Sequence, residues 1–365
     1  MSHDDARFMA LALSLGRRGQ GRCWPNPAVG CVVVREGRIV GRGWTGVGGR
    51  PHAEPQALAR AGDAARGATV YVSLEPCAHH GRTPPCTEAL IAAGVARVVA
   101  PVSDSDPRVS GKGFARLRDA GIEVTTGVLA EEAMRDLGGF LRRAGGGRPH
   151  LTLKLATSLD GRIATASGHS QWITGPQARH AVHAMRARHD AVMVGAGTAR
   201  ADDPMLTVRG QGDVPRQPVR IVVSRRLDLP LMSQLAQTAR DVPLWLCHGP
   251  DPDAVLAEAW DGIGAERIAC HLAGRQLDME AVLRALGERG LTRIFCEGGG
   301  SLAASLLGAG LVDELVMFSA GLMIGAEGLP ALGAMGLDRL DGAERFRLAE
   351  LRTIGDDAMS RWIKS

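Results

Sequence analysis

Aromatic residues and blocks of like charge are both scarce in this sequence. It holds six Phe, six Trp and one Tyr in 365 residues, and no run of five or more like charges occurs. The 43 Lys and Arg exceed the 39 Asp and Glu by only four. Proteins that bind nucleic acid through charge and base stacking combine a basic stripe with aromatic residues. We therefore expect no nucleic-acid partner, although a local basic patch remains compatible with a bound phosphate.

A membrane-spanning stretch, an export signal and a disulfide pattern are not found either. The longest apolar stretches stay well short of the roughly 18 residues that a membrane span needs. Asp4 and Asp5 precede the apolar part of residues 4–15, where a signal peptide would carry basic residues. The seven cysteines are an odd number scattered over a long chain, so they fit thiols or metal ligands better than a disulfide framework. We expect a soluble, cytoplasmic protein with no membrane partner.

Length and apolar periodicity predict two α/β domains. At about 150 residues per domain, the chain is long enough for roughly two. The pattern predicts a helix over 4–15 and a hairpin over 28–34 and 38–43, then helices at 53–61, 86–93 and 114–120 alternating with strands at 69–72, 97–102 and 122–126. Such alternation indicates an α/β layer with a largely parallel sheet. The glycine-rich segment 144–149 is the predicted boundary, which gives domains of 1–146 and 147–365.

The second domain shows the same kind of alternation. Residues 151–155 alternate apolar and mixed positions, which is typical of a strand with one buried face. Further strands are predicted at 191–194, 219–223, 244–247, 267–271, 293–296 and 314–318, and helices at 176–188, 279–289 and 302–307. This domain is therefore also expected to be α/β.

The strongest chemical signal is His52-Ala53-Glu54 followed by Cys77 and, nine residues later, Cys86. One imidazole and two thiolates suit zinc, with a fourth tetrahedral position left for water. His52 and Glu54 are two residues apart, so they would point to different faces of a helix, and Glu54 is predicted to carry protons rather than bind the metal. Zinc lowers the pKa of its water to about 7, which supplies hydroxide at neutral pH. The pattern predicts hydrolytic metal chemistry.

A closed structural zinc site is the alternative interpretation. It would need a fourth protein ligand, for which His79 and His80 are the candidates. Structural sites usually show paired short Cys spacings, and His79-His80-Gly81-Arg82 also fits a loop that faces a substrate. The cysteines at 31, 247, 270 and 296 are predicted to be core residues, and Cys23 is given no role.

These residues resemble the cytidine-deaminase-like zinc superfamily, whose signature is His-x-Glu with Pro-Cys-x-x-Cys. Eight residues instead of two separate Cys77 from Cys86, and this longer loop resembles the pyrimidine deaminases of the riboflavin pathway. The segment from Asn26 to Gly30 and the segment 106–113 match that family, which implies that Asn26 lies in the substrate pocket. The resemblance implies a mixed sheet sandwiched by helices, with Glu54 catalytic and with His52, Cys77 and Cys86 as the zinc ligands.

Two glycine motifs stand out in the second domain. Gly195-Ala196-Gly197 follows an apolar strand, but Arg200 occupies the third glycine position of a dinucleotide fingerprint, so the motif fits a tight strand-to-helix turn as well as a cofactor contact. The sequence Glu297-Gly298-Gly299-Gly300-Ser301 lies between a strand and a helix. Backbone amides at such a helix start can approach a pyrophosphate closely. A flexible turn is the alternative.

These motifs, with 154–161 and 195–209, resemble the dihydrofolate-reductase-like pyrimidine reductases that are fused to such deaminases. The resemblance implies a C-terminal dihydrofolate-reductase-like α/β domain. It also implies an NADPH site at Ala156, Trp172, Thr198, Asp202, Ser224, Gly299, Gly300, Ser301 and Leu302, and substrate contacts from Ser170, Arg186, Leu206, Arg209 and Glu297. Arg186 and Arg209 are predicted phosphate clamps, because guanidinium groups fit phosphate oxygens bidentately. A core role is the alternative for Trp172, and Arg188 is expected to be a solvated helix charge.

The resemblance implies a bifunctional enzyme of riboflavin biosynthesis that uses Zn²⁺ and NADPH. We also expect a homo-oligomer, a dimer. It would deaminate 2,5-diamino-6-ribosylamino-4(3H)-pyrimidinone 5′-phosphate to 5-amino-6-(5-phosphoribosylamino)uracil and then reduce the ribosyl group to ribityl. Lys154 and Asp160 both remain candidates for protonating the imine in the second step. The alternatives are a nucleic-acid base deaminase with an appended nucleotide-binding domain, and a structural zinc module joined to a nucleotide sensor.

Overall fold

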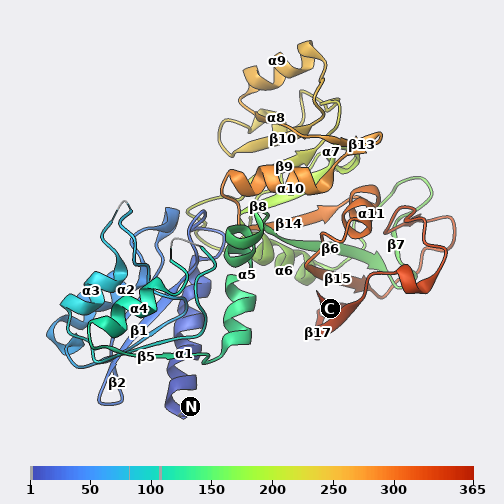
Figure 1. The fold of residues 1–365 in the computed structure, drawn as a ribbon. Helices are drawn as coiled ribbons and strands as arrows, with labels where there is room; N and C mark the ends of the chain where they lie inside the picture. The colour runs from blue at the N-terminus through green and yellow to red at the C-terminus, as the bar shows by residue number, and fades with distance from the viewer. Residues whose placement is uncertain (1–2, 82, 107–108) are drawn as a thin grey trace. The chain divides into compact units, whose positions relative to one another are not determined.

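The chain folds as two units, 1–148 and 149–365, in a computed structural model that describes residues 3–81, 83–106 and 109–365 (Figure 1). Each unit is built on one main β-sheet, and helices pack on the faces of the sheets. Across these described residues, no helix combines the length and apolar character needed to cross a lipid bilayer.

The first unit contains a five-stranded mixed sheet. Its strand order is β2 (Arg38–Trp44), β1 (Gly30–Arg35), β3 (Thr69–Val72), β4 (Arg97–Ala100) and β5 (Glu123–Thr126). β1 is antiparallel to both neighbours, whereas β3, β4 and β5 run parallel. The predicted mixed sheet is confirmed. The strands that alternate with helices, β3, β4 and β5, are parallel as expected, and only β1 runs in the opposite direction to its neighbours.

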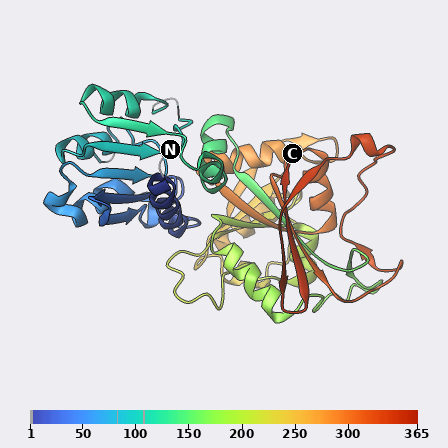
Figure 2. The ribbon, with the colours of Figure 1, turned by 90° about the horizontal axis from the view of Figure 1, so that it is seen from below.

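Helices cover both faces of this sheet, as the period of two in β1 requires. Val32 and Val34 pack on α1 (His3–Gly16), while Cys31 and Val33 pack in the core formed with α2 (Ala53–Ala61), α3 (Cys86–Ala92) and α4 (Lys112–Asp119). α5 (Ala130–Gly146) contributes to both cores. Short 3₁₀ turns lie at Arg17–Gly19, Val47–Gly49 and Gly62–Ala65. Figure 2 shows the sheet between these helix layers.

Two glycines of β2 bring α2 close to the sheet. A Cβ on Gly41 would lie 2.1 Å from the carbonyl oxygen of Ala57, and one on Gly43 would lie 2.2 Å from that of Ala53. Only glycine permits such close contact between a helix and a strand backbone. The position of α2, which begins directly after His52, is therefore fixed by backbone contact.

The second unit contains a nine-stranded sheet. Seven parallel strands are followed by an antiparallel hairpin, in the order β11 (Glu266–Ala269), β10 (Leu244–His248), β9 (Val219–Val223), β8 (Ala191–Gly195), β14 (Arg293–Gly298), β6 (His150–Ser158), β15 (Glu314–Ala320), β18 (Asp357–Lys364) and β17 (Phe346–Ile354). Two small pairs accompany it, β7 (Arg162–Ala164) with β16 (Leu329–Pro330) and β12 (Leu272–Ala273) with β13 (Gln276–Leu277). The predicted α/β architecture of this domain is confirmed.

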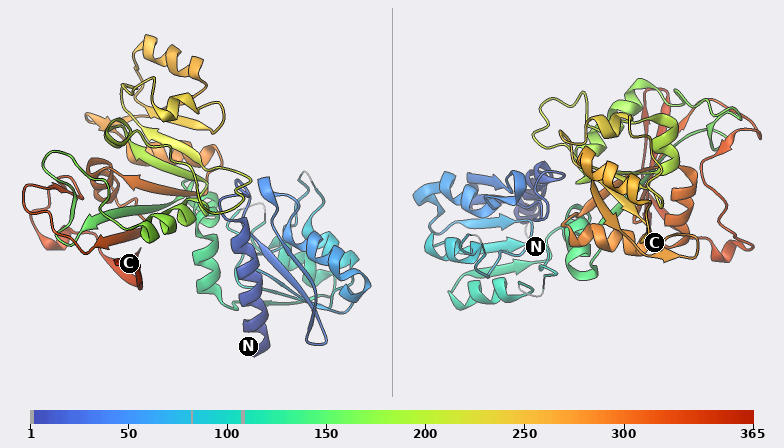
Figure 3. Two further views of the ribbon diagram at one scale, coloured as in Figure 1. Left: turned by 180° about the vertical axis from the view of Figure 1, so that it is seen from behind. Right: turned by 90° about the horizontal axis from the view of Figure 1, so that it is seen from above.

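Helices lie on both sides of this sheet (Figures 2 and 3). α6 (Pro176–Arg186) packs on Phe295 and Phe318, and α9 (Ala254–Ile263) packs through Trp260 in the core that includes Val192. Phe295 and Val192 are register partners, so these two helices cover the same face. The remaining elements are α7 (Ala196–Asp202), α8 (Gln234–Gln237), α10 (Met279–Glu288), α11 (Gly300–Gly308) and a 3₁₀ turn at Leu340–Gly342.

Several parts of the fold differ from the sequence-based expectation. The glycine-rich segment predicted as a boundary is helical as far as Gly146, because α5 continues through it. α9 was not predicted. The hairpin of β17 and β18 was also not predicted, because β17 is exposed along most of its length and carries no apolar alternation.

Candidate metal centre and cofactor site

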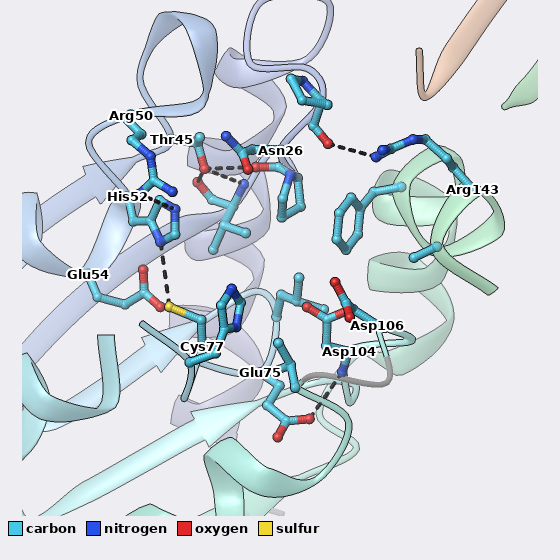
Figure 4. A pocket seen from close by; sticks show the side chains of 18 residues that line it. Asn26, Thr45, Arg50, His52, Glu54, Glu75, Cys77, Asp104, Asp106 and Arg143 are labelled. Carbon is cyan, nitrogen blue, oxygen red and sulfur yellow. Dashed lines mark hydrogen bonds between the residues drawn. The ribbon is translucent and has the colours of Figure 1, made fainter. Parts of the chain in front are cut away.

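Three predicted metal ligands converge in the first unit, and Figure 4 shows two of them, His52 and Cys77. His52 precedes α2 in extended conformation, Cys77 lies in the loop after β3, and Cys86 is the first residue of α3. The imidazole Nδ1 of His52 lies 3.3 Å from Cys86 Sγ and 3.8 Å from Cys77 Sγ. All three donor atoms lie within 4.8 Å of one another. The structure therefore brings together donors that are 34 residues apart in the chain.

This spacing fits a tetrahedral zinc ion. Bonds of about 2.0–2.1 Å to nitrogen and about 2.3 Å to sulfur place neighbouring donors roughly 3.5–3.8 Å apart. One imidazole and two thiolates are also the donor chemistry that zinc favours. Within the described part of the chain, the donor group includes no fourth His, Cys, Asp or Glu. His80 instead contacts Glu88 at 3.1 Å and is largely exposed. The arrangement favours an open position over the closed structural site.

The thiol of Cys77 is strongly acidified. Hydrogen bonds from Cys86 and His52 lower the pKa of Cys77 to about 4 against the opposing effect of burial. The backbone N–H of Cys86, at the start of α3, also donates to Cys77 Sγ at 3.3 Å. A hydrogen bond with Cys77 raises the pKa of His52. The site thus favours a thiolate, the form in which cysteine binds metal.

Glu54 lies beside these ligands on the first turn of α2 and is only 4 % exposed. Burial raises the pKa of its carboxyl group, and the nearby Cys77 adds to the effect. Raised pKa values suit carboxyl groups that donate and accept protons near neutral pH. The geometry supports the predicted separation of roles between Glu54 and the three ligands.

A cavity of about 420 Å³ opens in front of this group. Asn26, predicted to lie in a substrate pocket, lines it together with His52 and Glu54 (Figure 4). The side-chain amide of Asn26 donates to the carbonyl oxygen of Gly49 at 3.4 Å. Gly49 has a φ of +88°, and a Cβ there would lie 1.9 Å from Asn26 Nδ2. A glycine at this position is therefore required for Asn26 to keep its place.

Glu75 is a buried residue to which the sequence assigned no role. Its carboxylate accepts four backbone N–H bonds: from Asp104 at 3.1 Å, Gly111 at 3.0 Å, Gly113 at 2.9 Å and Phe114 at 3.3 Å. These bonds connect the loop of Cys77 to the start of α4. Sequence spacing gave no signal of them, because the donors are backbone groups 29 to 39 residues away.

Asp104 also lines the cavity and was not predicted. Burial raises the pKa of its carboxyl group to about 6. Its Oδ1 accepts the backbone N–H of Asp106 at 2.8 Å. Arg82, from the loop expected to face a substrate, and Pro107 and Arg108, from the segment 106–113 that matches the deaminase family, lie outside the described residues.

In the second unit, the predicted cofactor residues gather where parallel strands end. Ala156 lies near the end of β6, Thr198 on α7 directly after β8, and Ser224 directly after β9. The Gly299 to Leu302 turn follows β14 and begins α11. In open α/β sheets, ligands bind beyond the carboxyl ends of the strands. These residues come from separate segments but share that edge.

The glycine turn after β14 is tightly packed. Gly298 and Gly299 have φ values of +91° and +94°. A Cβ on Gly299 would lie 2.7 Å from the hydroxyl oxygen of Thr198, and that hydroxyl donates to the carbonyl oxygen of Gly298 at 3.3 Å. The turn and Thr198 therefore form one structural unit, rather than a flexible connection. Gly195 also ends β8 as the predicted strand-to-helix turn.

Arg186 and Glu297 form a buried ion pair. Arg186 Nη2 donates to Glu297 Oε2 at 3.0 Å, a second bond joins Nε to Oε1, and Nη1 donates to the carbonyl oxygen of Thr207 at 2.8 Å. Burial alone would raise the pKa of Glu297, but the charge and hydrogen bonds of Arg186 lower it overall. Much of the Arg186 guanidinium is thus committed to protein groups, which does not favour its predicted role as a phosphate clamp.

Lys154 lies in the same charged group. Burial lowers the pKa of its amine, although the charge of Glu297 opposes the effect. Partial burial raises the pKa of Asp202, and the positive charge of Lys154 opposes this effect. Arg209 is exposed, and its backbone N–H donates to His183 Nδ1 at 3.2 Å. Arg209 therefore keeps an exposed side chain, as a phosphate clamp requires.

The remaining predicted residues occupy loops and the rim of this edge. Trp172 is 67 % exposed, with the Arg179 guanidinium 4.7 Å from its ring centre, so the alternative of a core residue is wrong. Ser170, two residues before Trp172, is half-buried. Leu206 is buried and has a φ of +54°. Ser224 is buried, and its hydroxyl donates to Asp228 at 3.3 Å. The exposed ring of Trp172 remains available to a planar ligand.

Comparison with known protein families finds two matches that follow the order of the units. A family described as the cytidine and deoxycytidylate deaminase zinc-binding region matches residues 2–102. A family described as the RibD C-terminal domain matches residues 149–360. The second match covers more than half of the chain.

Individual relatives match along almost the whole chain. The riboflavin biosynthesis protein RibD of Escherichia coli strain K12 is 43% identical over 364 residues, which cover 97% of each chain. A solved structure named Acinetobacter baumannii RibD, form 1, has a TM-score of 0.88 at 36% identity and 99% coverage of both chains. A Thermotoga maritima structure named as a diaminohydroxyphosphoribosylaminopyrimidine deaminase/5-amino-6-(5-phosphoribosylamino)uracil reductase has a TM-score of 0.86 at 33% identity, covering 100% of this chain and 99% of that one.

Proposed function

The chain belongs to the RibD family of riboflavin biosynthesis proteins, and from this premise we propose which of its residues carry its two activities. It is a bifunctional enzyme that combines a zinc-dependent deaminase with an NADPH-dependent reductase. The deaminase is assigned to residues 1–146 and the reductase to 147–365. The family matches at 2–102 and 149–360, and the division of the fold between 148 and 149, support this assignment.

The deaminase substrate is 2,5-diamino-6-ribosylamino-4(3H)-pyrimidinone 5′-phosphate, in keeping with the activity named for the Thermotoga maritima relative. His52, Cys77 and Cys86 would hold the zinc ion, which activates water at neutral pH when bound. Glu54 would accept one proton of that water and pass it to the ring nitrogen, and would then carry the second water proton to the departing amine. The 2-amino group leaves as ammonia, and the oxygen of water becomes the new carbonyl. Asn26 and Asp104 line the pocket in which the pyrimidine is oriented.

The observation that carries this assignment is the convergence of three zinc-type donors beside one buried carboxyl group. Glu54 is too buried to be a solvated surface charge, and its raised pKa suits proton transfer. A nucleic-acid base deaminase, the alternative from sequence, is disfavoured by matches along almost the entire chain to riboflavin biosynthesis proteins.

The reductase transfers hydride from NADPH to ribose C1′ of the deaminated product, in its ring-opened imine form. The NADPH contacts are assigned to Ala156, Trp172, Thr198, Asp202, Ser224 and the Gly299 to Leu302 turn, and the substrate contacts to Ser170, Leu206, Arg209 and Glu297. Ala156, Thr198, Ser224, Glu297 and the Gly299 to Leu302 turn lie at or near strand ends, which supports this set. Arg209 is the phosphate contact, while Arg186 orients Glu297.

Lys154 is the better candidate for supplying the proton that the imine nitrogen takes up. Its amine is buried beside Glu297 and has a lowered pKa, which makes proton donation easier. Asp160, the other candidate from sequence, holds a different position. Its carboxylate binds the backbone N–H of Gly325 at 2.7 Å, and its pKa is lowered to about 2. A carboxyl group of that pKa carries no proton to donate near neutral pH.

A cytoplasmic, homodimeric enzyme with a small-molecule substrate and no nucleic-acid partner completes the proposal. All seven cysteines are free thiols, which suits a reducing compartment. Leu348 and Leu351 are exposed on the edge strand β17, where a second copy would cover them. Light scattering of the purified chain tests the dimer.

A two-stage assay tests the proposed function. Given the pyrimidine substrate and NADPH, the zinc-loaded enzyme should release ammonia first and oxidise NADPH afterwards. Omission of NADPH should leave ammonia release intact. A chain with full zinc occupancy that releases no ammonia would refute the deaminase assignment, and it would favour a structural zinc module joined to a nucleotide sensor.

A further inference from the structure

Asp160 is exposed, yet its carboxylate collects hydrogen bonds from two directions. On one side it accepts the hydroxyl of Ser158 at 2.5 Å. On the other side it accepts the backbone N–H of Ile324 at 3.2 Å and that of Gly325 at 2.7 Å. The two donors 324 and 325 are about 165 residues away in the chain. Asp160 therefore ties the turn after β6 to the loop that follows β15.

The same turn holds this loop at further points. The carbonyl oxygen of Gly161 accepts the backbone N–H of Ala331 at 3.1 Å. Next to it, β7 pairs with β16, with Leu329 opposite Ala164. A Cβ on Gly328 would lie 2.6 Å from the Ile324 side chain, so the loop is also folded tightly on itself. We name residues 321–333 the tethered loop. Figure 1 shows β7 and α11 on the same side of the second unit.

The far end of the tethered loop packs on the glycine turn that begins α11. The backbone N–H of Gly333 donates to the carbonyl oxygen of Gly300 at 3.0 Å. A Cβ on Gly300 would lie 3.3 Å from the carbonyl oxygens of both Pro330 and Ala331. The tethered loop thus forms one wall of the turn to which the NADPH phosphates are assigned. The position of the tethered loop therefore determines the space at this turn and the backbone groups that are accessible to NADPH.

We propose that Asp160 is a positioning residue for NADPH binding, which acts by holding the tethered loop against the Gly299 to Leu302 turn. The proposal rests on the cofactor site assigned above. A carboxylate suits this task because every group that faces it is a donor, and charged hydrogen bonds are stronger than neutral ones. The hydroxyl of Ser158 and these backbone N–H groups hold the pKa of Asp160 at about 2, so the tether is intact throughout the physiological pH range.

The expected effect on NADPH affinity follows from the fraction of molecules in which the tethered loop is in place. When only a fraction of the molecules holds the loop in place, the apparent affinity for the ligand falls by that fraction. In this proposal Asp160 affects NADPH binding through the tethered loop and does not contact NADPH directly. Its loss should therefore change NADPH affinity while the hydride step, once NADPH is bound, stays close to normal.

Asp160→Ala tests the proposal in the full-length, zinc-loaded enzyme. NADPH fluorescence titration should show a Kd raised by about tenfold, inside the roughly 5- to 150-fold range of typical coupling between sites. The reductase kcat at saturating NADPH and the shape of its pH profile should stay unchanged. The exposed Asp338, further along the same connection, provides the matched control, and Asp338→Ala should bind NADPH as the wild type does. Ammonia release by the other unit verifies folding and concentration.

A second measurement needs no cofactor. Hydrogen exchange of the peptide that spans 321–333 should be faster in Asp160→Ala than in the wild type, while β9 exchanges at the same rate. Unchanged exchange in this peptide would overturn the proposal, and so would an unchanged Kd for NADPH. A third outcome would also overturn the proposal: Asp160→Ala lowers kcat and removes one limb of the pH profile, while the Kd for NADPH is unchanged. That result would make Asp160 a catalytic acid.

One further variant separates this proposal from the cofactor assignment on which it rests. Gly300→Ala should weaken NADPH binding, because its Cβ would crowd the carbonyls of Pro330 and Ala331. If Gly300→Ala binds NADPH normally, the cofactor assignment is wrong. If Gly300→Ala binds weakly while Asp160→Ala binds normally, only the positioning role of Asp160 is refuted.

Discussion

Replacing Arg186 by Gln should expose how strongly the reductase unit depends on the Arg186–Glu297 pair. Both side chains are only 11 % exposed, and the guanidinium also binds the carbonyl of Thr207. Removing one partner of a buried ion pair costs about 3–5 kcal/mol. Lys154 remains beside Glu297 and offsets part of the loss, so we expect a loss of stability of about 2–3 kcal/mol.

The pH dependence of this loss has a definite sign. In the wild type the pKa of Glu297 is lowered. Its ionisation therefore stabilises the fold fully above the ordinary carboxyl pKa of about 4.3, and this contribution to the free energy of unfolding is constant between pH 6 and 8. Without Arg186, burial dominates and raises that pKa. The buried charge is then most costly at pH 8, and proton uptake relieves the cost as the pH falls. The deficit of the variant should therefore shrink from pH 8 toward pH 6.

Amide hydrogen exchange measures this effect locally, because a two-unit chain does not unfold in one step. Protection of the β14 peptide should fall by about 30- to 150-fold at pH 8, the equivalent of about 2–3 kcal/mol. Strand β3, in the other unit, serves as the internal reference. The exposed Arg188, two positions on, is the matched control, and Arg188→Gln should leave β14 protection unchanged. Unchanged protection in Arg186→Gln, combined with a raised KM for the pyrimidine, would refute the reasoning and restore Arg186 as a substrate clamp.

Three other variants test separate parts of the account. Arg209→Ala should raise the reductase KM for the phosphorylated pyrimidine by the equivalent of about 1.5–3 kcal/mol with little change in kcat, and an unchanged KM would exclude the phosphate contact. Asp104→Asn should remove an inflection near pH 6 from the deaminase pH profile, because burial places the pKa of Asp104 there, and a profile that keeps this inflection would assign it to another group. Gly49→Ala should impair deaminase turnover, because the new Cβ would displace Asn26, whereas Gly37→Ala, in the open turn between β1 and β2, should leave turnover intact.

The metal centre could be predicted from sequence because its donor types are rare and chemically specific. Few interpretations other than a zinc site fit His52, Cys77 and Cys86 once Glu54 is taken as a proton carrier. The structure places the three donors together. The helices and strands around them were also predictable, since α2 and β3 lie where the apolar period placed them. Local patterns sufficed for features made by side chains close in sequence or of distinctive chemistry.

Features made by backbone groups from distant segments could not be predicted in this way. The four N–H donors to Glu75 and the two backbone donors to Asp160 carry no side-chain signature. Arg186 and Glu297 are 111 residues apart, so no spacing rule pairs them. Their pairing exists only because β14 and α6 pack together in the fold. The sequence therefore predicted a set of reductase-site residues but not the contacts between them.

The zinc content and the ammonia release of Glu54→Gln test the central claim most directly. The account predicts one zinc ion per chain, as in the wild type, and a deamination rate lower by about 10²- to 10⁴-fold, the usual contribution of a general acid–base group. Loss of the metal from Glu54→Gln would show that Glu54 is a ligand. Full zinc occupancy with undiminished ammonia release would show that another group carries the proton, and either result would contradict the account.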